Sequence, residues 1–333
     1  MAKKVRKTEQ SRFGIGEWYG HLVSDLDAQR LQEFGEIGSA RFANLPCPFR
    51  IDADPAAECK KKGGVCTIRR HVKDELGTIS LEGPLVTLCP SRFWAGNQIF
   101  GWIGDAVLGT KFPTLVKEVQ FLTSLTDDDN EETGDSVGRI DTILVDPADP
   151  SRWCALEIQA VYFSGPKMSN HLAQYKDAVT APVFPDGTRR PDYRSSGPKR
   201  LMPQLQIKVP TLRRWGKKMA VVVDTPFFSS LGPMVEVAHL SNSDIVWFVI
   251  RHSPEDGTVT LERTVYTTLE SSVEALTAGV PLSLAAFEAE IGLFLNGRNA
   301  RARSKVIRLN APEPSPDGGS HLLGGAELPD SEN

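Results

Sequence analysis

The chain contains 333 residues, of which 40% are hydrophobic and 24% are charged, and its formal net charge is −4 at pH 7. This length allows one large domain or two smaller ones, and the composition is that of a folded globular protein. The sequence lacks the roughly 18 consecutive apolar residues of a membrane helix and the apolar core of a signal peptide. We therefore expect a cytoplasmic protein that does not associate with membranes.

Both ends of the chain have the composition of disordered segments. Residues 1–12 form a charged arm, and residues 311–333 are rich in proline, glycine and acidic side chains. Between them we expect a cysteine-bearing N-terminal region over residues 13–110 and a core over residues 111–310. An acidic run at residues 127–132 predicts a loop within that core.

Helices are predicted near residues 25–34 and 97–108, and the cysteine-bearing stretch between them shows little periodicity. Three strands follow, and turn-forming residues at 146–150 separate the last two. We expect these two strands to form a hairpin. The three predicted strands cover residues 117–122, 138–145 and 153–161.

After the hairpin, Ser169 can cap a helix that runs to about residue 179, and an apolar run at residues 219–224 predicts a buried strand. Apolar residues at three- and four-residue spacing predict a late helix that begins at Ser283. The order of three strands, a helix and a strand predicts an α/β fold with a mixed sheet flanked by helices. Two further strands are predicted over residues 245–251 and 258–266.

A pair of carboxylates is the main candidate for chemistry. Asp141 lies in one strand of the predicted hairpin and Glu157 in the next, and Gln159 projects to the same face as Glu157. Two carboxylates in this arrangement suit magnesium, which would activate a bound water and stabilise charge on a phosphate. The alternative is that these are solvent-facing strand residues. Apolar or small neighbours on both sides of Glu157 favour the site, because buried polar groups without a partner are costly.

The chain has five cysteines, and four of them fall within a stretch rich in proline and glycine. An odd number of cysteines in a reducing compartment favours thiols or metal ligands over disulfides. Four thiolates could form a tetrahedral zinc or iron site that stabilises this stretch, whereas the alternative is scattered core cysteines. We expect Cys154 to be a core residue and His71 to be a surface residue; the alternative for His71 is a ligand that replaces one of the cysteines. The four predicted metal ligands are Cys47, Cys59, Cys66 and Cys89.

Positive charge is concentrated between residues 189 and 218, where ten basic residues stand against one acidic residue. Such segregation is typical of a surface that binds phosphates, and arginines there would suit a GC-rich DNA target. A smaller basic patch lies at residues 60–62 with Arg69 and Arg70, and it could equally be a solvated face. The residues that we predict to bind DNA are Arg189, Arg190, Arg194, Lys199, Arg200, Arg213 and Arg214.

These residues together carry a resemblance to a known family. Asp141 followed by Glu157, Ile158 and Gln159 resembles the PD-(D/E)XK nuclease signature, with Gln159 where most members have lysine. With the four cysteines and the stretch at residues 89–93, the chain is similar to the NotI family of type II restriction endonucleases over about residues 47–223.

The resemblance implies a restriction-endonuclease-like core in which Asp141 and Glu157 hold Mg²⁺ and Gln159 positions the attacking water. It also implies iron at the cysteine site, although sulfur ligation fits zinc equally well. Glu118 could add a carboxylate or be a surface strand residue. We expect a homodimer that cuts a GC-rich palindrome in double-stranded DNA and leaves 5′-phosphate ends.

The alternative function is a catalytically inactive DNA-binding regulator on a nuclease fold. The absence of the motif lysine at Gln159 favours this alternative. The intact pair of Asp141 and Glu157 opposes it, because a protein without nuclease activity has no need to direct two carboxylates at a polyanion.

Overall fold

The structure is a computed structural model that describes residues 10–39, 45–123, 136–165, 168–178, 180–277, 279 and 282–296. The predicted acidic loop at residues 127–132 and the tail at 311–333 lie outside the described residues. Strand β1 (Gln10–Trp18) begins inside residues 1–12, the segment predicted as a disordered arm, so residues 10–12 are part of a strand instead. The chain divides into two compact units, residues 1–279 and 280–333.

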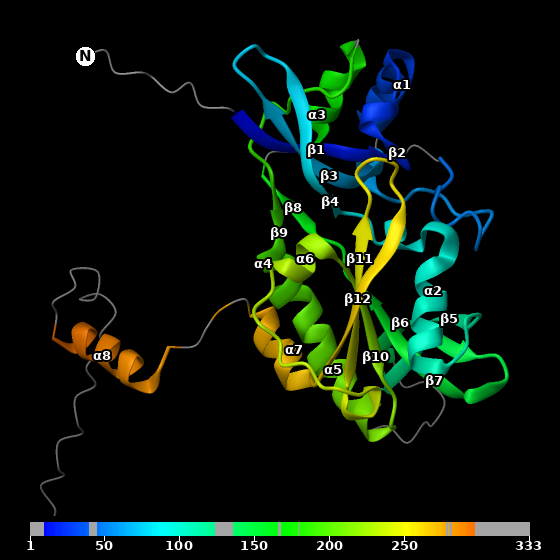
Figure 1. Ribbon diagram of the computed structural model, residues 1–333, viewed down its shortest axis with the longest axis vertical. Helices are drawn as coiled ribbons and strands as arrows, with labels where there is room; N and C mark the ends of the chain where they lie inside the picture. Colours follow the sequence, from blue (N-terminus) through cyan, green and yellow to red (C-terminus); the bar gives the residue numbers. More distant parts are fainter. Residues whose placement is uncertain are drawn as a thin grey trace, which may run out of the picture. The chain divides into compact units, whose positions relative to one another are not determined.

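The centre of the first unit is a six-stranded mixed sheet with the order β12-β11-β10-β7-β6-β5 (Figure 1). Strands β7, β10 and β11 run parallel to one another, whereas β5, β6 and β12 run antiparallel to their neighbours. The predicted hairpin and the later strands are confirmed. The strands are β5 (Thr114–Thr123), β6 (Ser136–Asp146), β7 (Asp149–Ile158), β10 (Met219–Asp224), β11 (Ile245–His252) and β12 (Val259–Thr267).

Helices cover both faces of this sheet (Figure 1). Because side chains alternate along a strand, Val221 packs in one hydrophobic cluster with Leu205 of α5, and Val222 packs in another with Phe100 of α2. The predicted α/β class is confirmed. The helices of the first unit are α1 (Ala28–Ser39), α2 (Gln98–Ile103), α3 (Met168–Gln174), α4 (Tyr193–Ser196), α5 (Met202–Arg214), α6 (Thr225–Ser229) and α7 (Leu269–Leu276).

A second, four-stranded antiparallel sheet with the order β2-β1-β3-β4 occupies the N-terminal region, where we had expected irregular chain. Trp18 and Ile68 share a hydrophobic cluster with Val221 of the central sheet, so this region and the core form one compact unit. The additional strands are β2 (His21–Leu22), β3 (Val65–Lys73) and β4 (Ile79–Thr87), and a separate two-stranded ribbon is formed by β8 (Tyr162–Ser164) and β9 (Arg190–Asp192).

Two single-residue predictions are tested by burial. Cys154 is fully buried in β7, as we expected. His71 is also fully buried, in β3, and the expectation of a surface residue was wrong. Its two ring nitrogens each lie 3.0 Å from a backbone carbonyl oxygen, that of Val183 and that of Ile15. The two arginines that precede His71 in the sequence gave no sign of this enclosure.

The second unit contains the predicted late helix, α8 (Leu284–Leu295). Its start is confirmed, because the Ser283 hydroxyl accepts a hydrogen bond of 3.2 Å from the Ala286 backbone N–H. We had placed this helix in the core, whereas it belongs to a separate compact unit. None of the helices in the described parts of the chain is long and apolar enough to span a membrane.

Candidate active site: two carboxylates and a basic cleft

The hairpin of β6 and β7 brings the predicted carboxylates to the same face of the sheet. Its register pairs Thr142 with Leu156 and Ile143 with Ala155. Ile143 and Ala155 both pack in the cluster that contains Leu205 of α5. Asp141 precedes Ile143 by two residues and Glu157 follows Ala155 by two, so both carboxylates project toward the α5 face. Asp141 lies close enough for its charge to affect the ionisation of Glu157.

Glu157 is largely buried, and a lysine on α5 neutralises it. The Nζ atom of Lys208 donates a hydrogen bond of 2.9 Å to Oε2 of Glu157, and Lys208 itself is 3% exposed. Burial raises the pKa of Glu157, the Lys208 ammonium lowers it, and the charge of Asp141 raises it again. The sheet and α5 therefore bring together two carboxylates and one buried cation.

Sequence reasoning missed Lys208 as a site residue, although a signal was present. On α5, Lys208 falls between Leu205, Val209 and Leu212, which have the spacing of a buried helix face. A lysine at a core position of such a helix needs a buried partner, and Glu157 is that partner.

Gln159 and Glu118 occupy different surroundings. The backbone N–H of Gln159 donates to the carbonyl of Val222 at 3.0 Å, and its side-chain amide donates to the carbonyl of the adjacent Ala160. Glu118 lies on the edge strand β5 between residues that pair with the neighbours of Asp141. Its side chain is 74% exposed, and its carboxylate lies 3.6 Å from the guanidinium of Arg139. Gln159 thus follows directly after the strand that carries Glu157, whereas Glu118 lies on the exposed edge of the sheet.

A cleft of about 690 Å³ opens over Glu157 and Gln159. Two of its cationic residues come from the N-terminal region, and two come from the turn that precedes α5. The guanidinium of Arg200 is fixed there by stacking on Tyr162, with Cζ 3.6 Å from the ring centroid. The Glu157 carboxylate and four cations lining one cleft suit a bound phosphodiester chain. The four cations that line the cleft are Lys61, Lys62, Lys199 and Arg200.

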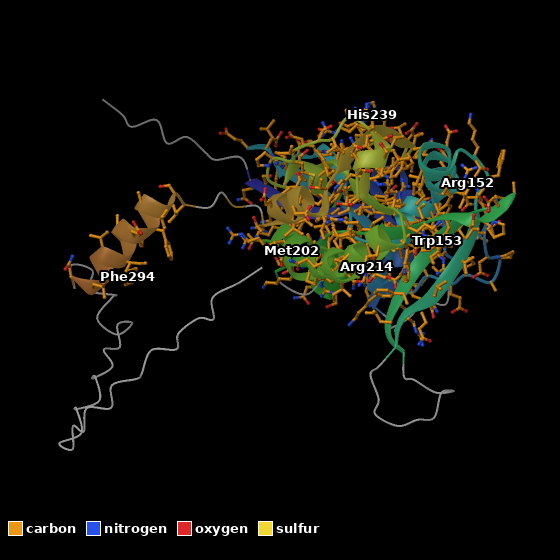
Figure 2. The ribbon with its side chains drawn as sticks, turned by 90° about the horizontal axis from the view of Figure 1, so that it is seen from below. Arg152, Trp153, Met202, Arg214, His239 and Phe294 are labelled. Carbon is orange, nitrogen blue, oxygen red and sulfur yellow. The ribbon has the colours of Figure 1, made fainter. Side chains whose placement is uncertain are left out.

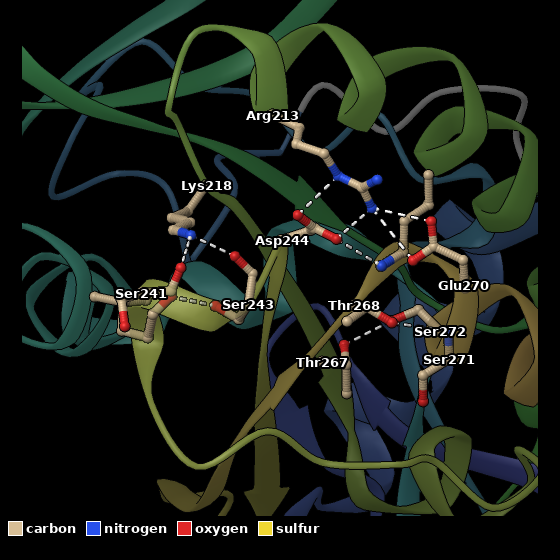
Figure 3. Close-up of polar contacts among 12 residues, drawn as sticks. Arg213, Lys218, Ser241, Ser243, Asp244, Thr267, Thr268, Glu270, Ser271 and Ser272 are labelled. Atoms are coloured by element: carbon tan, nitrogen blue, oxygen red, sulfur yellow. Dashed lines mark hydrogen bonds and ion pairs between the residues drawn. The ribbon is translucent and has the colours of Figure 1, made fainter.

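The basic segment at 189–218 does not form one continuous face. Lys199 and Arg200 line the cleft, but Arg213 and Arg214 lie at the far end of α5, a helix whose 13 residues span about 20 Å. Figure 2 labels Met202 and Arg214, the first and last residues of this helix. Arg213 pairs with Asp244 at 2.5 Å and with Glu270 at 3.1 Å (Figure 3). These two arginines are placed away from the cleft.

The remaining predicted DNA contacts are mixed. The side chain of Arg189 is fully buried and pairs with Asp186 at 3.2 Å, which does not suit a contact to DNA. Arg190, in β9, and Arg194, in α4, are exposed. Of the seven predicted residues, Lys199 and Arg200 are therefore the two that line the cleft together with Glu157.

The predicted metal-binding cysteines are free thiols in one region of the fold. Burial raises the pKa of Cys66, and charge on Cys89 and on Cys59 raises it further. Burial likewise raises the pKa of Cys59, with further increases from Cys89 and Cys47. The four thiol groups therefore lie close enough for the charge of one to affect the ionisation of another. Among the residues that the structure describes, however, no three His, Cys, Asp or Glu side chains are grouped as they would be to hold a metal ion.

The mixed α/β fold, the carboxylate pair and the basic cleft define an arrangement suited to an enzyme that hydrolyses phosphodiester bonds. A family model described as restriction endonuclease NotI matches residues 33–262, more than two thirds of the chain. The chain therefore belongs to the NotI restriction endonuclease family, which makes it a nuclease of a restriction system that acts on double-stranded DNA. No curated protein matches the chain.

Proposed function

We propose that the chain is a type II restriction endonuclease that hydrolyses double-stranded DNA at a specific site and leaves 5′-phosphate ends. The observation that carries this proposal is the placement of Asp141 and Glu157 on adjacent strands, with Glu157 at the floor of a cleft lined by four cations. The order of β5, β6 and β7, a helix, and a parallel β10 supports a PD-(D/E)XK core.

Asp141 and Glu157 would hold a magnesium ion. The pair fits this ion, because Mg²⁺ usually takes one or two protein carboxylates and completes its octahedron with water and phosphate oxygens. When bound, the ion supplies an activated water and stabilises negative charge on the phosphate. Gln159 lines the same cleft as Glu157, and its amide would orient the attacking water. Glu118, opposite Asp141 at the sheet edge, would contribute a further carboxylate only after release from Arg139.

DNA would lie along the cleft with its phosphates held by Lys61, Lys62, Lys199 and Arg200. Each phosphate contact of this kind contributes affinity without reading the sequence. Arg190 and Arg194 are exposed nearby in sequence and could read guanines of a GC-rich site. A palindromic site would be cut by a homodimer, whose two-fold symmetry matches that of the DNA.

Cys47, Cys59, Cys66 and Cys89 would hold a structural iron or zinc ion. The backbone N–H of Cys89 donates a hydrogen bond of 3.2 Å to the carbonyl oxygen of Cys66, and this proximity of two of the four cysteines supports the site. A metal there would stabilise the segment that carries Lys61 and Lys62, both of which line the cleft.

Incubation of the purified protein with plasmid DNA and Mg²⁺ tests the proposal. Discrete fragments with 5′-phosphate ends are the expected result. A shift of DNA in a gel without any cutting would instead support the inactive regulator. The buried carboxylate beside Lys208 at the cleft floor favours the enzyme over that alternative.

A further inference from the structure

We propose that Lys208 is a positioning residue for cleavage, which supplies from helix α5 the positive charge that Gln159, just after strand β7, does not supply. This inference rests on the proposed function. Lys208 differs from the four cations of the cleft, because it contacts the candidate metal ligand Glu157 rather than lining the space that would receive DNA. Its effect on the reaction would therefore pass through Glu157.

The contact between Lys208 and Glu157 is enclosed. The two side chains are 4% and 10% exposed, and Nζ lies 2.9 Å from Oε2. The surrounding face of α5 is apolar, with Leu205, Val209 and Leu212 each buried. In such surroundings an ammonium and a carboxylate are fixed by each other, because neither can turn to water without losing its partner.

The contact between Lys208 and Glu157 would both orient the carboxylate and offset part of the negative charge of the site. The bond to Oε2 holds the Glu157 carboxylate in one orientation, and Glu157 still lines the cleft. Asp141 and Glu157 together carry negative charge where a phosphate must approach, and Lys208 offsets part of it. Gln159 can donate hydrogen bonds but carries no charge. Lys208 would therefore act on the rate of the chemical step and little on DNA affinity.

The test compares Lys208→Met, which keeps length but removes the charge, with Lys199→Met on the cleft wall. We expect Lys208→Met to lower kcat by about 10- to 100-fold with little change in KM, as for other groups that orient metal ligands. Lys199→Met should instead raise KM, because Lys199 lines the space for DNA. Lys208→Arg keeps the charge and should recover most of kcat.

Binding of DNA in calcium, without cleavage, provides a second readout. Lys208→Met should have a lower melting temperature, because it leaves Glu157 buried without its partner, but should bind DNA nearly as tightly as the parent protein. A merely structural role would lower DNA affinity together with kcat. That combined loss would overturn the proposal, and so would a parent value of kcat in Lys208→Met. If Lys208→Met does not fold, Lys208→Gln, which can still donate to Glu157, decides by the same criteria.

A parallel variant separates this inference from the proposed function. Glu157→Gln should abolish cleavage if Glu157 holds the metal. Full cleavage by Glu157→Gln would overturn the proposed site itself. Loss of cleavage by Glu157→Gln together with normal kcat in Lys208→Met would leave the proposed function intact and overturn only the role of Lys208.

Discussion

Removal of cations from the cleft should reduce the salt dependence of DNA binding in proportion to their number. A residue that neutralises one phosphate of B-form DNA contributes about 0.9 to the slope of log affinity against log salt concentration. Lys62, Lys199 and Arg200 line the cleft. Replacing all three by glutamine should therefore lower the magnitude of the slope by about 2.7, and Lys199→Gln alone should lower it by about 0.9.

Arg213→Gln is the matched control, since Arg213 belongs to the same basic segment but pairs with Asp244 and Glu270 at the far end of α5. The slope for each variant can be measured by fluorescence anisotropy of a labelled DNA duplex in the presence of Ca²⁺, at salt concentrations from about 50 to about 300 mM. Arg213→Gln should leave it unchanged. An effect of Arg213→Gln as large as that of Lys199→Gln, or no effect of the triple change, would refute the placement of DNA in this cleft.

Three further predictions concern stability and metal content. Serine in place of any of the four clustered cysteines should release metal and lower the melting temperature, whereas Cys154→Ser should keep the metal. Elemental analysis that finds the same metal content in every variant would contradict this prediction. Arg92→Met should lower the free energy of unfolding by about 3–5 kcal/mol, because it leaves Glu17 buried without its partner 2.7 Å away. Urea titration should show that the free energy of unfolding recovers in the double variant that also carries Glu17→Gln. Burial raises the pKa of Asp224 to about 6, so the folded form binds this proton more tightly than the unfolded form. The contribution of Asp224 to stability should therefore fall as pH rises from about 4 to about 6, and Asp224→Asn should lack that component in denaturation curves recorded across this range. The clustered cysteines are Cys47, Cys59, Cys66 and Cys89.

Features that depend on local sequence were predictable. The β6–β7 hairpin follows from two strand-like segments around a turn, and β10 from a short run of apolar residues. The placement of Asp141 and Glu157 on one face then followed from the alternation of side chains along the strands. Each of these features is decided by neighbours a few residues apart.

Features that depend on distant contacts were not predictable. Strands β1 and β3 pair residues such as Ile15 and Ile68, which are far apart in the sequence, and glycines interrupt the pattern of β1. The charge run at 189–218 gave no sign that Arg189 is enclosed while Arg200 stacks on Tyr162 beside the cleft. Tertiary packing decides which charges face DNA.

The central claim is that Asp141 and Glu157 form the catalytic centre of a nuclease. Cleavage of plasmid DNA in Mg²⁺ by the parent protein, Asp141→Asn and Glu157→Gln tests it directly, with DNA binding in calcium measured for each. We predict discrete fragments from the parent protein and none from either variant, while both variants still bind DNA. Cleavage by either variant at the rate of the parent protein would contradict the assignment.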